Sequence, residues 1–169
     1  YDEDFLALPQ IAQGIRTNGE PGFMNMINIR QYGRFGDVVG TEVIPGCIIQ
    51  EDRATGANPC GEISLESYET CCLSEVFPTR CNYTIDIHQA MKYATGYATI
   101  VNWLPTHRPE TNDVVSRNRR IGVSISGIFD WYERDGMSAI TRVMRDGYKV
   151  VRQTNRDLAY RAGHPPAIR

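Results

Sequence analysis

The stretch ATGANPCGEISLESYETCCLSEVFP, residues 54–78, decides how the rest of this sequence is interpreted. It contains three of the five cysteines of the chain. One of them, Cys60, stands between a proline and a glycine, with Asn58 two residues before it and Glu62 two residues after it. The pattern predicts a stiff turn that presents a thiol. A metal site, a disulfide and a reactive centre are the candidate roles for that thiol.

The chain as a whole has the size and composition of one globular domain. Its 169 residues are 41% hydrophobic and 22% charged, which is enough for one ordinary domain with a real core. The net charge of −2 argues against direct nucleic-acid binding, because the phosphate backbone favours a strong positive excess. No apolar run approaches the ~18 residues of a membrane span, so no membrane partner is expected.

Both ends of the sequence resemble cuts through a longer chain. The first ten residues, YDEDFLALPQ, are acidic where a secretory signal is basic, and they lack an initiator Met. The last seven, GHPPAIR, stop within an extended, proline-containing stretch. An odd number of irregularly spaced cysteines without a secretory signal argues against a disulfide framework. Reduced thiols in the cytoplasm are therefore expected.

The first half of the chain is predicted to contain one short helix, followed by loops and short strands. The helix is expected over 3–16, where the apolar residues lie on one side. Residues 23–29 alternate roughly and are expected to be a strand or a loop. Short or bulged strands are predicted within 38–52, and 54–62 has turn chemistry throughout. Residues 71–78 are expected to form a short buried strand.

Two longer helices and a strand are predicted in the second half. Asp86 and Gln89 fit a capping box, and apolar residues then recur at helical spacing until Pro105. Residues 118–131 are expected to be a strand buried on both faces, whose small residues allow close backbone approach. The last helix is expected over about 138–163. This order predicts an α/β or α+β domain in which helices cover a sheet.

Three other roles for the clustered thiols match the sequence less well. Structural zinc usually takes ligand pairs two to four residues apart, and no C-x2-C pair occurs. A hydrolytic cysteine needs a histidine base, but nothing near Cys60 resembles a protease signature, and Glu62 would have no function. A buried thiol without chemistry is the third alternative. A non-catalytic, thiol-rich structural or zinc-binding module therefore remains the alternative hypothesis.

A radical role uses every polar group around the central cysteine. An S–H bond is close in strength to a carbinol C–H bond, so a sulfur-centred radical at Cys60 can take a hydrogen atom from a sugar carbon. Glu62 can accept the proton of the neighbouring hydroxyl as a general base, and Asn58 can hold that hydroxyl. An extended tip would point all three side chains the same way. Reducing equivalents must come from a second thiol, for which Cys71 and Cys72 are the local candidates.

Three motifs together resemble the catalytic core of ribonucleotide reductase. They are NPCGE at 58–62, LESYETCCL at 65–73 and RNRRIGVSISGIFDW at 117–131. The spacing of eleven positions between Cys60 and Cys71 makes the short first motif specific. In detail, the chain resembles the adenosylcobalamin-dependent (class II) branch, in particular its monomeric ribonucleoside-triphosphate reductases. The resemblance covers most of the chain.

The resemblance implies a fold. Residues 1–169 would be one segment of a catalytic domain, part of a ten-stranded α/β barrel. A finger loop at about 54–66 would lie at the centre of that barrel and carry the radical cysteine. The remainder of the same reductase chain would be the obligate partner, and the segment alone would have no catalytic activity.

The resemblance also implies the site residues and the cofactors. Cys60 would abstract the 3′-hydrogen of a ribonucleoside triphosphate or diphosphate, while Asn58 and Glu62 bind and deprotonate at the 3′-hydroxyl. Cys71 would form one half of the active-site disulfide when the 2′-hydroxyl leaves as water, and Cys72 stands where relatives often carry Asn. Adenosylcobalamin and an external dithiol reductant such as thioredoxin are the implied cofactors. A dimeric cobalamin enzyme or an iron-type reductase is the near alternative.

Two further features receive structural interpretations. Arg117, Arg119 and Arg120 form a basic cluster beside the predicted strand, and a solvated or ion-paired face is expected, with a nearby nucleotide phosphate as the alternative. His88 lies near a helix start. It is expected to be a surface or packing residue.

Overall fold

The structure of the chain is a computed structural model that describes residues 8–20, 22–33, 38–39, 42–43 and 52–168. The elements in chain order are the helices α2 (Leu8–Asn18) and α3 (Met26–Tyr32), the strands β1 (Val38–Val39), β2 (Glu42–Val43), β3 (Gly56–Ala57), β4 (Ser64–Leu65) and β5 (Cys72–Val76), the 3-10 helix η1 (Pro78–Arg80), the helices α4 (Thr84–Asn102) and α5 (Pro109–Asn118), the strand β6 (Ile121–Ile125) and the helix α6 (Ile128–Ala162). None of the helices in these ranges is long and apolar enough to cross a membrane.

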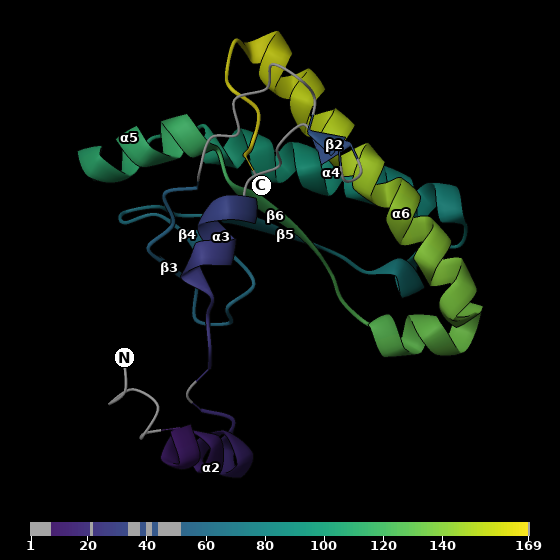
Figure 1. The fold of residues 1–169 in the computed structure, drawn as a ribbon. Coiled ribbons are helices and arrows are strands. Elements are labelled where there is room, and N and C mark those ends of the chain that lie inside the picture. The colour runs from purple at the N-terminus through teal and green to yellow at the C-terminus, as the bar shows by residue number, and fades with distance from the viewer. Residues whose placement is uncertain (1–7, 21, 34–37, 40–41, 44–51, 169) are drawn as a thin grey trace.

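The centre of the fold is the parallel pair of strands β5 and β6. Cys72 pairs with Ile121 and Val76 with Ile125, so the pairing runs over the full length of both strands. A parallel pair needs a long crossover connection, and here α4 and α5 lie in that connection. Figure 1 shows α4 and the long α6 lying together over the strand pair. This β–α–β arrangement confirms the predicted α/β class.

The hydrophobic core lies between the strand pair and the two long helices. It consists of six buried side chains from β5, α4 and α6: Val76, Ile87, Met91, Trp131, Ile140 and Val143. Trp131 is fully buried, and its indole N–H donates to Asp135 Oδ2 at 2.9 Å. Gly147 lets α6 approach α4 closely, because a Cβ there would overlap Met91 Sδ. His88 of α4 is half-buried, and its ring Nε2 lies 3.1 Å from the Val143 carbonyl oxygen of α6. This contact confirms its packing role.

Several predicted elements are confirmed. The helix expected over 3–16 is α2, and the short strands expected within 38–52 are β1 and β2, although both predictions extend beyond the described residues. The strand expected over 71–78 is β5, but it is shorter and largely half-buried or exposed, with only Val76 buried. The turn-rich segment 54–62 contains β3 and the turn that follows it.

The predicted start of α4 is wrong by three residues. The helix begins at Thr84, and Asp86 is its third residue, not the cap. The Asp86 carboxylate accepts the backbone N–H of Tyr83 at 3.1 Å, which satisfies a free donor at the helix start. A carboxylate in the first turn also interacts favourably with the helix dipole. Gln89 has no part in this cap.

Three other predictions are corrected. Residues 26–29 belong to α3, not to a strand or loop, because Asn25 caps a helix by accepting the N–H of Asn28 at 3.0 Å. The strand expected over 118–131 is limited to β6, which is half-buried in the described chain, not buried on both faces. It cannot continue because Gly127, at φ 75°, turns the chain into α6.

The last helix also begins earlier than expected. α6 starts at Ile128, and its regular geometry is broken at Gly136, where φ is 75° and ψ is 161°. The expected start near Ser138 corresponds to the second of the two helical parts. Helix α5 was not predicted at all, because its sequence PETNDVVSRN has few apolar residues to mark a periodic face.

The core assignment predicts that substituting two isoleucines of α4 by alanine lowers the free energy of unfolding by different amounts. Ile87 is 2% exposed and Ile85 is 69% exposed. We expect Ile87→Ala to lower the free energy of unfolding by about 2–5 kcal/mol, because it removes buried methyl groups and leaves a cavity. Urea unfolding followed by circular dichroism measures this, with Ile85→Ala as the matched control at within about 0.5 kcal/mol. Equal costs for the two variants would contradict the assigned orientation of α4.

Candidate active site

The candidate site is built on a short hairpin. Strands β3 and β4 are antiparallel, with Gly56 opposite Leu65 and Ala57 opposite Ser64. The hairpin is closed by the N–H of Asn58, which donates to the Ile63 carbonyl at 3.0 Å. Cys60 lies at the tip of this hairpin, and it is exposed.

The backbone of the tip is the tight turn that the sequence predicted, and not the extended conformation that would align the side chains at 58, 60 and 62 by alternation. The N–H of Gly61 donates to the Asn58 carbonyl at 2.9 Å, and Gly61 adopts φ 80°, which a residue with a Cβ rarely does. The predicted reason for convergence, an alternation of side chains at 58, 60 and 62, is therefore wrong.

The turn nevertheless brings the predicted polar groups together. Asn58 Nδ2 donates to Glu62 Oε1 at 2.5 Å across the turn. Asn58 Oδ1 accepts the N–H of Ile63 at 3.1 Å, which fixes the orientation of the amide. Glu62 is exposed, so its carboxylate is accessible from solvent beside the thiol of Cys60. A thiol, an amide and a carboxylate thus share one tip.

Cys71 lies just before β5 and is half-buried. Burial raises the pKa of its thiol to about 12, and the negative charges of Cys72, Glu69 and Glu62 contribute to the rise, while Arg120 opposes it. Cys71 is therefore held as a neutral thiol at physiological pH.

Cys72 lies in a different environment from its neighbour. Burial raises the pKa of its thiol, and a hydrogen bond with the Asn102 side chain opposes that rise. Successive residues of a strand point to opposite faces, so Cys71 and Cys72 cannot both face the hairpin. All four cysteines in the described part of the chain are free, and no group of three His, Cys, Asp or Glu side chains there could hold a metal ion.

The hairpin packs on one face of the β5–β6 pair. A Cβ at Gly122 of β6 would lie 3.6 Å from Ile63 Cδ1 of the hairpin and would overlap the Leu73 side chain. The missing side chain at Gly122 therefore makes room for both. Leu73 of β5 and Ile63 of the hairpin therefore lie on the same face of the strand pair, and Cys71 directly precedes β5.

A buried guanidinium ties the hairpin to β6. Arg120 donates through Nη1 and Nη2 to Asp52 and through Nε to Glu69, each at 3.0 Å, and its side chain is 0% exposed. Burial lowers the pKa of Arg120, but the hydrogen bonds and charges of the two carboxylates outweigh burial and raise it. Asp52 precedes the hairpin and Glu69 follows it. Both sides of the loop are therefore attached to one side chain.

A second ion pair holds the end of the hairpin. Arg117 of α5 donates to both carboxylate oxygens of Glu66 at 2.7 Å, and Asn118 Nδ2 donates to one of them at 3.2 Å. The expected ion-paired face of the arginine cluster is confirmed for Arg117 and Arg120. The phosphate alternative is wrong for Arg120, because its buried side chain is not accessible to a nucleotide. Its role as an anchor was missed, since no local pattern marks its partners.

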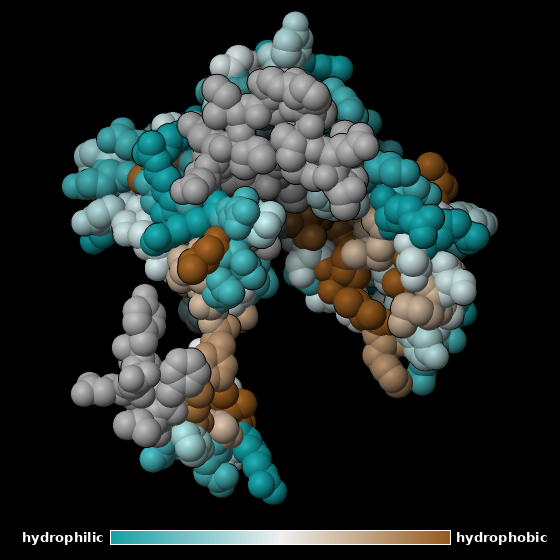
Figure 2. Space-filling model, in the orientation of Figure 1, coloured by the Kyte–Doolittle hydropathy of each residue, from teal (hydrophilic) through white to brown (hydrophobic). Residues whose placement is uncertain are grey.

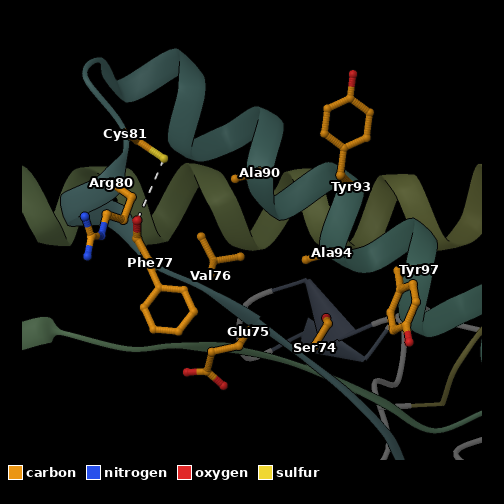
Figure 3. Close-up of a pocket in the computed structure, with 10 residues that line it drawn as sticks. All are labelled: Ser74, Glu75, Val76, Phe77, Arg80, Cys81, Ala90, Tyr93, Ala94 and Tyr97. Atoms are coloured by element: carbon orange, nitrogen blue, oxygen red, sulfur yellow. Dashed lines mark hydrogen bonds between the residues drawn. The ribbon is translucent and has the colours of Figure 1, made fainter.

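An open cavity of the described structure lies away from the hairpin tip. It has a volume of about 550 Å³ and lies between β5 and α4, where Tyr93 and Tyr97 project from the helix (Figure 3). Its lining is mostly apolar, and it includes neither the hairpin tip nor Cys71. Figure 2 shows hydrophobic side chains gathered near the strand pair, where Leu73 and Phe77 are 53% and 52% exposed. A contiguous apolar surface of this kind is typical of a place where further protein packs.

Comparison with known proteins now identifies the class. The chain is 37% identical over 139 residues to the adenosylcobalamin-dependent ribonucleoside-triphosphate reductase of Euglena gracilis, covering 82% of this chain and 18% of that protein. It is 36% identical to the probable enzyme of that name from Dictyostelium discoideum, covering 95% and 20%. It is 43% identical over 126 residues to the adenosylcobalamin-dependent ribonucleoside-triphosphate reductase of Lactobacillus acidophilus, covering 74% of this chain and 16% of that protein. No family model matches the chain.

A solved structure agrees with these relatives. The crystal structure of a B-12 dependent (class II) ribonucleotide reductase superimposes with a TM-score of 0.77 at 29% identity, covering 95% of this chain and 25% of that chain. The chain is therefore homologous to a segment of the ribonucleotide reductases. More particularly, its relatives are the adenosylcobalamin-dependent ribonucleoside-triphosphate reductases, which confirms the resemblance found in the motifs. The chain spans about a fifth of the length of the curated relatives that it matches first.

The environments of the two cysteines predict very different reactivity. In the folded, reduced chain at pH 8 we expect iodoacetamide to label Cys60 at least about tenfold faster than Cys71, because the thiolate is the nucleophile. Cys60 is exposed, whereas Cys71 is half-buried with a pKa raised to about 12. Mass spectrometry of tryptic peptides measures both rates, and labelling of Cys71 should still be increasing between pH 9 and the pKa of about 12. Equal rates at pH 8, or a plateau for Cys71 below pH 10, would refute this description of Cys71.

Proposed function

We propose that this chain supplies part of the catalytic site of an enzyme that reduces ribonucleotides to 2′-deoxyribonucleotides by thiyl-radical chemistry. The observation that carries the proposal is the hairpin tip, where the exposed Cys60 lies in the turn between Asn58 and Glu62, whose side chains are hydrogen-bonded to each other. Relatives at 36–43% identity are named ribonucleoside-triphosphate reductases, which supports the same activity here.

In this proposal the chain is a segment of the catalytic domain, and the hairpin at about 54–66 is the finger loop of a ten-stranded α/β barrel. Strands β5 and β6 would be two of the barrel strands. They are parallel, helices cover one side of them, and within the described residues they pair only with each other. The exposed apolar residues near β5 would be covered by the remainder of the same reductase chain, which is the obligate partner.

The first chemical step takes place at the tip. The thiyl radical of Cys60 takes the hydrogen atom from C3′ of the ribose, so that an S–H bond forms as the C–H bond breaks. Glu62 accepts the proton of the 3′-hydroxyl as a general base, and Asn58 holds that hydroxyl by a hydrogen bond. The hydrogen bond from Asn58 to Glu62 presents the carboxylate before any substrate arrives, which reduces the cost of ordering the site.

The second step is the reduction at C2′. Replacing the 2′-hydroxyl by hydrogen, with loss of water, requires two electrons and two protons. Cys71 and a second thiol from another segment of the protein would supply both by forming a disulfide. The high pKa of Cys71 keeps its proton in place until this step. Cys60 then returns the hydrogen atom to C3′, and a thioredoxin-like dithiol reduces the disulfide.

Adenosylcobalamin is the proposed cofactor, since the relatives are named for it. When bound, it supplies the radical that is passed to the protein. Cys60 fits such a contact, because its thiol is exposed and a Cβ placed on the adjacent Gly61 would have no atom within 4 Å. A ribonucleoside triphosphate or diphosphate is the proposed substrate. Free thiols at the site require a reducing compartment, for which we propose the cytoplasm.

The essential role of the tip thiol predicts complete loss of activity on its removal. In the complete reductase, Cys60→Ser should lower deoxyribonucleotide formation to background, because an O–H bond is too strong to exchange hydrogen with C3′. Stability should change by no more than about 0.5 kcal/mol, since the side chain is exposed. Product analysis by chromatography measures the activity, and Cys81→Ser is the control with another free thiol. Deoxyribonucleotide formation by Cys60→Ser would end the proposal.

The base role predicts a smaller, graded loss at the neighbouring carboxylate. Glu62→Gln should lower kcat by about 10²–10⁴-fold with KM little changed, because the amide keeps the shape of the side chain but cannot accept the proton. Steady-state kinetics of the complete reductase measure this, with Glu110→Gln on the exposed start of α5 as the control. A Glu62→Gln enzyme with the kcat of the parent would show that another group is the base.

A further inference from the structure

The buried arginine before β6 contacts carboxylates on both sides of the hairpin. Arg120 makes hydrogen bonds at 3.0 Å to Asp52 and to Glu69, which lie on opposite sides of the hairpin in the sequence. Asp52 Oδ1 also accepts the N–H of Ala54 at 3.0 Å, where the hairpin begins. Glu69 Oε2 accepts the N–H of Glu66 at 2.7 Å, where the hairpin ends. One guanidinium therefore fixes the two legs of the loop.

The same guanidinium is directly connected to the region of the second thiol. Glu69 is two residues before Cys71, and its side chain is 0% exposed and paired with Arg120. Arg120 and Glu69 are also among the groups whose charges act on the Cys71 thiol, together with Cys72 and Glu62. The segment from the hairpin to Cys71 is thus short, buried at its middle and attached to Arg120.

We propose that Arg120 is a positioning residue of the reaction, which holds Cys71 in a fixed place relative to the hairpin tip that carries Cys60 and Glu62. The inference rests on the proposed function. In that reaction two sulfurs act on adjacent ribose carbons within one encounter. The chain therefore needs a device that fixes the distance between the tip and the second thiol, and the contacts of Arg120 provide one.

The hairpin cannot provide this rigidity itself. Its strands β3 and β4 have two residues each, and a two-stranded hairpin is marginally stable in water. A misplacement of about 1 Å can cost a reaction about 10²-fold. Arginine suits the task because its planar fork fixes two carboxylates in defined directions, whereas lysine offers a single flexible charge.

A purely structural role for Arg120 predicts a different result. If Arg120 only stabilised the fold, its loss would lower the amount of active enzyme. The rates of hydrogen abstraction at C3′ and of reduction at C2′ would then decrease by the same factor. If Arg120 positions Cys71, the step at the tip survives while the reduction at C2′ is lost. The two steps can be followed separately. A hydrogen taken from C3′ becomes the thiol hydrogen of Cys60, and the part of it that exchanges with solvent before Cys60 returns a hydrogen atom to C3′ is released to water.

The test uses the complete reductase, loaded with its cofactor, and a ribonucleoside triphosphate that carries tritium at C3′. Tritium released to water reports the step at Cys60, and deoxyribonucleotide reports the whole reaction. For Arg120→Lys we expect deoxyribonucleotide formation to fall by about 10–100-fold while tritium release falls by less than about threefold. The ratio of release to product should thus rise at least threefold, with KM unchanged because Arg120 is buried away from substrate.

Arg119→Lys is the matched control. Arg119 is the adjacent residue and donates to the Asn102 carbonyl at 3.0 Å, away from the hairpin. The ratio of tritium release to deoxyribonucleotide product for Arg119→Lys should therefore stay at the parent value. If Arg120→Lys does not fold, Glu69→Gln takes its place. Its amide oxygen can still accept from Arg120 Nε, which preserves the fold, but its NH2 group cannot accept the N–H of Glu66 and the charge is lost, so the end of the hairpin is held less firmly and the ratio should again rise. Equal decreases in release and product, or no decrease in either, would overturn the proposal. Tritium release by Cys60→Ser would instead contradict the proposed function itself.

Discussion

Arg120 is buried between the carboxylates of Asp52 and Glu69, and these contacts join segments that lie 68 and 51 positions away from it. Removing one partner of such a buried pair usually costs about 3–5 kcal/mol, because a charge is left without a counter-charge out of water. The folded state is therefore most stable when both carboxylates contact the guanidinium. The position of the hairpin on the face of β5 and β6 follows from these contacts.

The candidate active site depends on this constraint and adds little stability of its own. Gly122 leaves the space into which Ile63 of the hairpin packs, and Gly61 allows the turn that presents the thiol of Cys60. The thiol of Cys60 is exposed, whereas burial keeps the thiol of Cys71 neutral by raising its pKa. One thiol is thus accessible from solvent, and the other is held in its protonated form. A rigid scaffold under an exposed reactive loop is a common arrangement in enzymes.

The sequence predicted what local chemistry determines. The NPCGE motif identified the tip, since Pro59 and Gly61 have backbone preferences that favour a turn. Apolar spacing identified β5 and most of α4. The sequence failed where distant contacts or single backbone conformations decide. Nothing near Arg120 reveals partners more than fifty positions away, and only the left-handed conformation of Gly127 ends β6. Seven residues of α3 are too few for a period to distinguish a helix from a strand, and α5 lacks an apolar face.

The most direct measurement is an experimental structure of the complete reductase with a ribonucleotide bound. The account predicts that the ribose lies over the hairpin, with C3′ facing the sulfur of Cys60, the 3′-hydroxyl against the carboxylate of Glu62, and C2′ on the side of Cys71. A ribose bound elsewhere on the protein, or one whose C3′ faces away from Cys60, would contradict it.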